Sequence, residues 1–270
     1  MPAATLIRRR PTAPLPRRPA AADPATLRRL VEYAVRAPSA QDAQPWLFRI
    51  RGDALELRVD RTASTTDPGY RGRVIDCGAA LAYLRVAIRA LGRTAHVQRF
   101  PDAGDPDLLA TIRLGEPCDA TLDEVTLFAA IRRRGTHRRP FSERPVPERV
   151  LATLADTVRI EGAWLQVLSE PAERAAVAGD ACTAPALLVL GTDDDSPAAW
   201  LRCGEALGLL LLRACVHGVA VSFIDPPVEV CALRTELARL PGGSRRQVVL
   251  GIGYGNGLPC LGGDDDVLMD

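Results

Sequence analysis

Apolar and polar residues along the chain change repeatedly from a helical period to a strand period. A helical pattern opens at Asp23-Pro24 and stops at Pro38, because Asp caps helix N-termini and Pro ends helices. Segments 46–50 and 55–59 then alternate like strands, and Gly52-Asp53 between them is typical of a hairpin turn. The folded part of the chain therefore begins, near residue 23, with a helix that leads into sheet.

The same order recurs further along the chain. A second predicted helix, at 74–91, contains the run Cys77-Gly78-Ala79-Ala80, whose small side chains permit close approach of another helix. The helix at 198–217 is apolar nearly all round, so we expect it to be central and buried. The other expected helices lie at 122–134, 147–158 and 228–240, and the other expected strands at 96–100, 109–114, 163–168, 185–191, 219–224 and 247–255.

These patterns predict an α+β fold with two related halves that share a core, although no residue-level repeat is visible. We expect the first half at 23–120 and the second at 121–258. Residues 1–22 are rich in Arg and Pro and are expected to form a flexible arm, because the prolines prevent a helix. Residues 259–270 are expected to form a loose acidic tail.

Composition narrows the possible classes of protein. The 270 residues carry a formal net charge of +1 and a mean hydropathy of +0.01, so nothing suggests nucleic acid as a partner. The longest apolar run, 206–216, is too short to span a bilayer, and the start lacks the apolar core of a signal peptide. We therefore expect a cytoplasmic protein with no membrane partner, acting on a small molecule.

The reactive side chains give no sign of a metal centre or a catalytic triad. Seven cysteines are scattered without a Cys-x-x-Cys pair, and three histidines lie far apart, so metal-ligand spacing is missing. We interpret the cysteines as reduced thiols packed as small hydrophobes. The chain contains no Lys, so its side-chain cations are arginines, which suit bidentate phosphate binding.

An arginine-rich tract follows the helix predicted at 122–134. Arg134, Arg138 and Arg139 can each direct two N–H groups at phosphate oxygens, and the Thr136 hydroxyl can add a donor. A solvated basic helix end, favoured by the helix dipole, is the alternative interpretation. No aromatic residues interleave, so a cofactor phosphate fits the tract better than nucleic acid.

A turn dense in small and polar residues covers Ala37 to Trp46. Ser39, Asp42 and Gln44 could place backbone and side chains against a ligand, or could simply close a loop with Trp46 in the core. The turn alone does not separate these alternatives.

Taken together, the turn and the tract resemble the nitroreductase superfamily. Ala-Pro-Ser-x-x-x-x-Gln-Pro-Trp at 37–46 is similar to its flavin-binding turn, and Arg-Gly-Thr-His-Arg-Arg-Pro-Phe at 134–141 resembles its phosphate segment. Segments 77–81 and 251–255, and the start of the long helix near Gly204, also match. The order, with the turn first and the phosphate segment in mid-chain, is similar to the Acg-like branch, in which one chain forms a pseudo-dimer with one FMN site.

The resemblance implies a nitroreductase-like fold, with central antiparallel or mixed sheets flanked by helices, and FMN between the halves. NAD(P)H would reduce the flavin, which would pass electrons to an electron-poor small molecule, so no triad or dedicated acid is expected. The chain would be a monomer or a homodimer. The candidate cofactor-binding residues are Pro38, Ser39, Asp42, Gln44, Arg134, Thr136, Arg138 and Arg139.

The sequence departs from the family pattern in four places. Asp42 stands where the family usually has Asn, and Leu250 where Acg-like chains often have Arg. Asp225-Pro226-Pro227 replaces a loop that commonly offers donors, and the span from Leu168 to Pro185, where relatives carry a lid, is short. Two alternatives therefore stay open: an FMN-sequestering protein with little turnover, and a flavin-less member with a structural or different biosynthetic role.

Overall fold

The computed structural model describes residues 23–62, 70–137, 139–178, 184–224 and 245–255. Within these ranges the chain forms two antiparallel sheets of four strands each, one from an early and one from a late part of the sequence. The first sheet has the order β1-β2-β4-β3, and the second has the order β5-β6-β8-β7. The strands are β1 (Trp46–Arg51), β2 (Ala54–Val59), β3 (Arg93–Arg99), β4 (Leu108–Pro117), β5 (Trp164–Leu168), β6 (Ala186–Thr192), β7 (Ala220–Phe223) and β8 (Arg245–Gly253).

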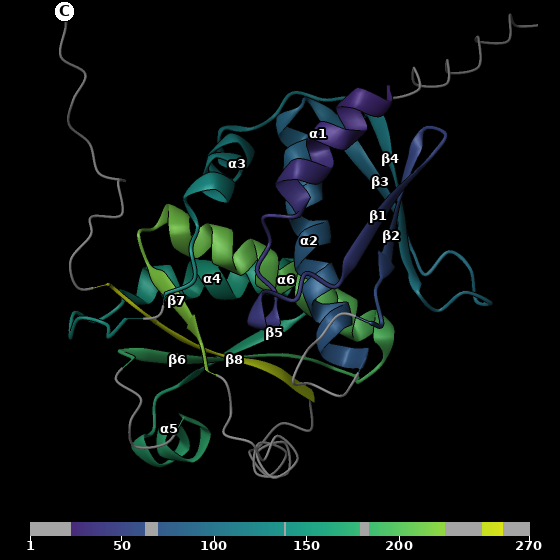
Figure 1. The fold of residues 1–270 in the computed structure, drawn as a ribbon. Helices are drawn as coiled ribbons and strands as arrows, with labels where there is room; N and C mark the ends of the chain where they lie inside the picture. Colours follow the sequence, from purple (N-terminus) through teal and green to yellow (C-terminus); the bar gives the residue numbers. More distant parts are fainter. Residues whose placement is uncertain (1–22, 63–69, 138, 179–183, 225–244, 256–270) are drawn as a thin grey trace, which may run out of the picture.

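Helices fill the space between the two sheets, with α2 and α6 at the centre (Figure 1). Capping residues in the sequence mark where helices begin. At the start of α1 the Asp23 carboxylate accepts the N–H groups of Ala25 and Thr26, and at the start of α3 Thr121 and Glu124 form a capping box. No helix among the described residues is both long and apolar enough to cross a membrane. The helices are α1 (Pro24–Ala34), the short 3₁₀ helix η1 (Ala40–Asp42), α2 (Tyr70–Ala90), α3 (Leu122–Arg133), α4 (Glu148–Ile160), α5 (Pro171–Ala178) and α6 (Pro197–Val216).

The crossing of α2 and α6 confirms the close approach predicted from the small residues near Cys77. A Cβ added to Gly78 would lie 2.3 Å from the carbonyl oxygen of Leu201. A Cβ added to Gly204 would lie 1.9 Å from the carbonyl oxygen of Ile75. Both helices are buried along most of their length, so this contact forms the centre of the molecule.

A buried ion cluster fixes the same two helices. The Glu205 side chain on α6 is 1% exposed, and its carboxylate accepts hydrogen bonds from Arg85 on α2 and Arg99 on β3 at 2.8–2.9 Å. Arg85 also donates to Glu161, at the end of α4, at 2.6 Å. Both charges of each pair are thus satisfied, as buried ion pairs require.

The predicted α+β fold class is confirmed, and the predicted helices and strands within the described ranges are present. Two elements were not predicted: the short η1, and α5, which begins at Pro171. The helix predicted at 228–240, the arm at 1–22 and the tail at 259–270 lie outside the described residues. The division into halves at 23–120 and 121–258 stays a prediction.

Candidate functional site

The turn after α1 has an unusual backbone. Gln41, Asp42 and Gln44 have φ angles of 51°, 59° and 45°, in the left-handed region that residues with a Cβ seldom adopt. Such conformations persist only where the surroundings hold them, and they cluster at ligand-binding sites. The turn therefore needs specific anchors.

Three side chains supply these anchors. The Asp76 carboxylate, on α2 and 8% exposed, accepts the N–H of Ala40 at 3.0 Å. The Ser39 hydroxyl oxygen accepts the N–H of Gln44 at 2.9 Å, which closes the turn across its base. The Cys77 thiol donates to the carbonyl oxygen of Pro45 at 3.5 Å. The turn is thus fastened to α2, and Trp46 is buried behind it, as the loop-closing interpretation expected.

The arginine tract begins where α3 ends. Arg134 is the C-cap residue of α3, and its guanidinium donates to the Thr136 hydroxyl at 3.5 Å and to the Arg36 carbonyl oxygen at 3.4 Å. The Arg134 Nε is buried and has no hydrogen-bond partner among the described residues. Burial raises the pKa of the nearby Tyr83 hydroxyl, and the charge and hydrogen bonding of Arg134 partly oppose this.

A cavity of about 290 Å³ joins the turn to the tract. The two motifs lie about 90 positions apart in the sequence, so only the fold brings them together. The wall carries three arginines and a single carboxylate, and this imbalance favours an anionic ligand. Lining residues are Val35, Arg36, Ala37, Pro38, Ser39, Asp42, Gln44, Ile131, Arg132, Arg134 and Thr136.

Six of the eight predicted site residues line this cavity: Pro38, Ser39, Asp42, Gln44, Arg134 and Thr136. Arg139 is exposed and is not part of the wall, and Arg138 lies outside the described residues. Arg36 and Arg132 were not among the predicted site residues. Arg132, in the last turn of α3, belongs to the arginine-rich tract from which the phosphate site was predicted, whereas Arg36 follows the C-cap of α1 and its only signal was a basic residue after a helix end.

Beyond Thr136 the tract runs along the second sheet. The N–H of His137 donates to the carbonyl oxygen of Val221, and Phe141 forms a β-bridge with Gly255 beyond the end of β8. The His137 and Phe141 rings lie 4.6 Å apart. Leu250 is fully buried in this sheet, so the position holds a core side chain. Segment 225–227 lies outside the described residues.

Two of the described cysteines are protected by burial. Burial raises the pKa of Cys77 and brings that of Cys203 to about 12, so both thiols stay protonated and poorly nucleophilic, whereas Cys118 is exposed. The described residues contain no group of three His, Cys, Asp or Glu side chains suited to a metal ion.

Comparison with known proteins agrees with the motifs, although no family model matches the chain. It is 31% identical over 298 aligned positions to "Putative NAD(P)H nitroreductase Rv3131" of Mycobacterium tuberculosis, covering 86% of each chain. It is 32% identical to "Putative NAD(P)H nitroreductase acg" of the same organism, covering 78% of this chain and 83% of that one. The first alignment is longer than the 270 residues of this chain, so that relative carries insertions that this chain lacks.

A solved structure agrees on the fold. The crystal structure of "a putative nitroreductase" from Anabaena variabilis ATCC 29413 superposes with a TM-score of 0.62 at 11% identity, covering 82% of each chain. The architecture is thus the nitroreductase fold, and the class is that of the nitroreductase-type oxidoreductases. The chain belongs to the nitroreductase family, in the Acg-like branch that its motifs indicated.

Proposed function

We propose that the protein is an NAD(P)H oxidoreductase that binds FMN in the arginine-lined cavity and reduces an electron-poor small molecule. The observation that carries this proposal is the cavity itself, which joins the Pro38–Gln44 turn to Arg134 and Thr136. We also propose that the chain works as a monomer or homodimer, without nucleic acid or membrane partners.

The polar groups of the cavity fit the phosphate end of FMN. The two Nη atoms of Arg134 make only long hydrogen bonds, of 3.5 Å to the Thr136 hydroxyl and 3.4 Å to the Arg36 carbonyl oxygen, and no carboxylate among the described residues pairs with the guanidinium. Phosphate oxygens would be stronger acceptors for these N–H groups, because the hydrogen bonds would join opposite charges. Arg36 and Arg132 add positive charge to the same wall.

The turn would hold the ring end of the cofactor. Its strained backbone is fixed by Asp76 and Ser39, so it forms a rigid edge beside the arginines. Bound FMN would supply the hydride chemistry, and the protein would orient it and limit access to it. Pro38, Ser39 and Gln44 would lie along the ring, as the family resemblance implies.

Asp42 sets a limit on this site. Its exposed side chain lies on the cavity wall, where its negative charge repels phosphate and any flavin form that carries a negative charge. The exchange Asp42→Asn should therefore strengthen FMN binding while leaving the fold unchanged. An FMN-sequestering role remains the second candidate, because the same carboxylate disfavours reduced flavin.

The experiment is a titration of the purified protein with FMN, followed by anaerobic NADH and NADPH. Bound flavin should show absorbance near ~450 nm and lose it on addition of a reduced nicotinamide. A protein that binds FMN and stays oxidised would support the sequestering role. A protein that cannot be loaded with FMN at all would overturn both.

A further inference from the structure

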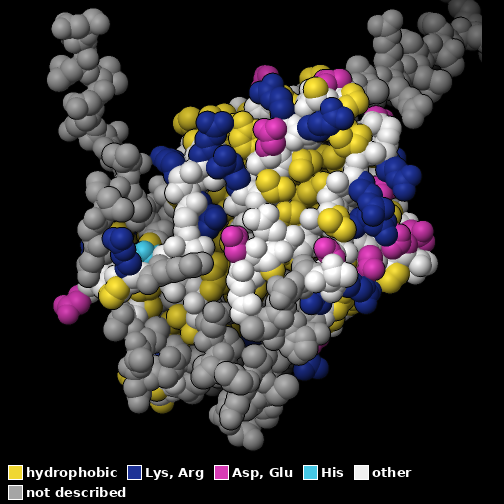
Figure 2. Space-filling view, in the orientation of Figure 1, with side chains coloured by type: hydrophobic (Ala, Val, Ile, Leu, Met, Phe, Trp, Pro, Cys, Tyr) yellow, Lys and Arg dark blue, Asp and Glu magenta, His cyan; other side chains and the backbone are white. Residues whose placement is uncertain are grey.

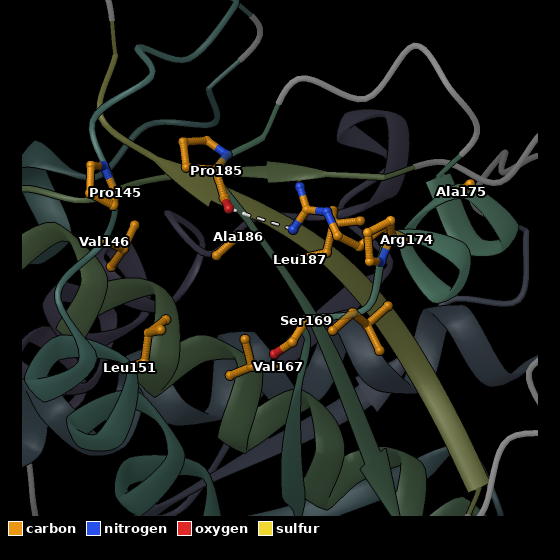
Figure 3. Close-up of a pocket in the computed structure, with 12 residues that line it drawn as sticks. Pro145, Val146, Leu151, Val167, Ser169, Arg174, Ala175, Pro185, Ala186 and Leu187 are labelled. Carbon is orange, nitrogen blue, oxygen red and sulfur yellow. Dashed lines mark hydrogen bonds between the residues drawn. The ribbon is translucent and has the colours of Figure 1, made fainter.

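A second and larger cavity, of about 570 Å³, lies at the end of the second sheet where β5 finishes and β6 begins (Figure 3). Its size falls within the range of ~300–1,000 Å³ typical of small-molecule sites. It shares no lining residue with the arginine-lined cavity. Its ligand chemistry can therefore be considered separately from the proposed flavin site.

Most of the side chains that line the cavity are apolar, although polar atoms make up as much of its open surface as apolar ones, and the lining comes from α4, β5, α5 and β6 with the segments beside them. Val146 lies just before α4, Leu151 lies in the first turn of α4, and Val167 lies near the end of β5 (Figure 3). Ala186 and Leu187 of β6 form another part, and both are buried. These residues belong to the hydrophobic clusters on the two faces of the sheet, so the cavity exposes part of the hydrophobic core at the end of the sheet.

Arg174 is the single charged residue among those that line this cavity. Arg174 of α5 donates to the carbonyl oxygens of Ala184 at 2.6 Å and Pro185 at 3.5 Å, and the second of these bonds is drawn in Figure 3. The two bonds hold the planar guanidinium beside the opening and use two of its five N–H groups. Among the described residues no carboxylate forms an ion pair with Arg174.

We propose that this cavity binds a small hydrophobic carboxylate, with its apolar body against Val146, Leu151 and Val167 and its carboxylate on Arg174. A guanidinium fixed in place binds a carboxylate with little loss of side-chain freedom. The Ser169 hydroxyl, also on the wall, offers one more donor. A phosphate ester or dinucleotide fits poorly, because the single arginine on the cavity lining does not balance two or more negative charges.

The test compares acids with matched alcohols by calorimetry. Decanoate and 2-naphthoate represent chain-like and aromatic bodies, and decanol and 2-naphthalenemethanol are their neutral counterparts. We expect one or both acids to bind roughly tenfold more tightly than the matched alcohol, because a charge-assisted hydrogen bond is gained. Whichever acid binds more tightly shows whether the cavity prefers a chain-like or an aromatic carboxylate.

Three arginine variants and two alanine variants locate the site. Arg174→Gln should remove the preference for acid over alcohol and Arg174→Lys should keep part of it, whereas Arg159→Gln, at an exposed position of α4, should change nothing. Ala175→Trp should block both ligands, because exposed Ala175 lines the cavity, whereas Ala172→Trp on the same helix should not. The proposal is overturned if the wild-type protein binds neither acid, or if Arg174→Gln keeps the full preference for acid. It is also overturned if Ala175→Trp binds as well as Ala172→Trp.

Discussion

Gly78 of α2 and Gly204 of α6 meet backbone to backbone: a Cβ added to Gly78 would lie 2.8 Å from the Cα of Gly204. The two helices stand between the two sheets, so this contact lies at the centre of the molecule (Figure 1). Side-chain size at either glycine therefore decides how closely the two central helices pack.

Gly78→Ala should destabilise the protein, although Ala favours helices by about 1 kcal/mol over Gly. The added methyl group would meet the Leu201 carbonyl oxygen at 2.3 Å, and overpacking of this kind costs ~1–3 kcal/mol of unfolding free energy. Urea unfolding measures the change. Gly135→Ala is the control, because a Cβ there meets nothing within 4 Å. Equal stability of the two variants would contradict the tight crossing.

Asp76→Ala should loosen the turn at the site. The Ala40 N–H would lose its acceptor, at a cost of ~1–3 kcal/mol of unfolding free energy if the group stays buried. FMN affinity should fall as well, because the positive-φ backbone would no longer be held. Asp76→Asn keeps an oxygen acceptor and should preserve most of both. Chemical unfolding and flavin fluorescence titration give the two values, and an Ala variant that matches Asn on both would refute the anchoring role.

Glu205→Ala should be among the more damaging single substitutions. It leaves Arg85 and Arg99 without their common partner, and breaking a buried pair costs about 3–5 kcal/mol. The expected cost lies at the lower end, because both arginines keep some contact with water. Asp156→Ala, which breaks the exposed pair with Arg159, should cost ~0–1 kcal/mol. Similar losses for the two variants would show that the cluster contributes little.

Glu124 should make stability depend on pH in acid. Its hydrogen bond to Arg89, with further bonds from Thr121, lowers the pKa of Glu124 to about 2. A carboxylate with a lowered folded-state pKa gives stability that is complete above its unfolded pKa and is lost as the pH falls toward 2. The unfolding free energy of Glu124→Gln should therefore fall less between pH 5 and pH 2 than that of the wild type. Parallel pH profiles would contradict this.

Arg134 and Arg139 should differ in their effect on FMN. Arg134 lines the cavity and its Nη atoms make only long hydrogen bonds, so Arg134→Gln should weaken FMN binding by ~1.5–3 kcal/mol if it binds the phosphate. Arg139 is exposed and outside the wall, so Arg139→Gln should change affinity much less. Flavin fluorescence titration measures both dissociation constants. The reverse order would place the phosphate further along the tract.

The sequence was informative where a local rule acts. The Asp23-Pro24 cap, the Gly52-Asp53 turn and the small residues near Gly78 each predicted a feature that the structure contains. The two site motifs were also found from the sequence, because their residue types match the nitroreductase pattern. These features could be predicted because each depends on residues that are neighbours in the sequence.

Features that depend on tertiary contact could not be predicted. The left-handed backbone at Gln41 and Asp42 has no glycine to signal it and depends on the distant carboxylate of Asp76. Arg36 and Arg132 reach the cavity only because α1 and α3 end side by side. Surface charge gave no guide either, since arginines and acidic residues are interspersed over the face in Figure 2.

The arginine-lined cavity has one wall from the turn after α1 and another from the end of α3. A ligand that fills it acts as a cross-link between two distant parts of one chain. At a free ligand concentration of 100 times the dissociation constant, binding would add about 2.7 kcal/mol to the unfolding free energy. A chain cut in the 118–121 connection would then give two fragments that reassemble more readily when the ligand is present. Fragment complementation could thus report occupancy of the site without any turnover.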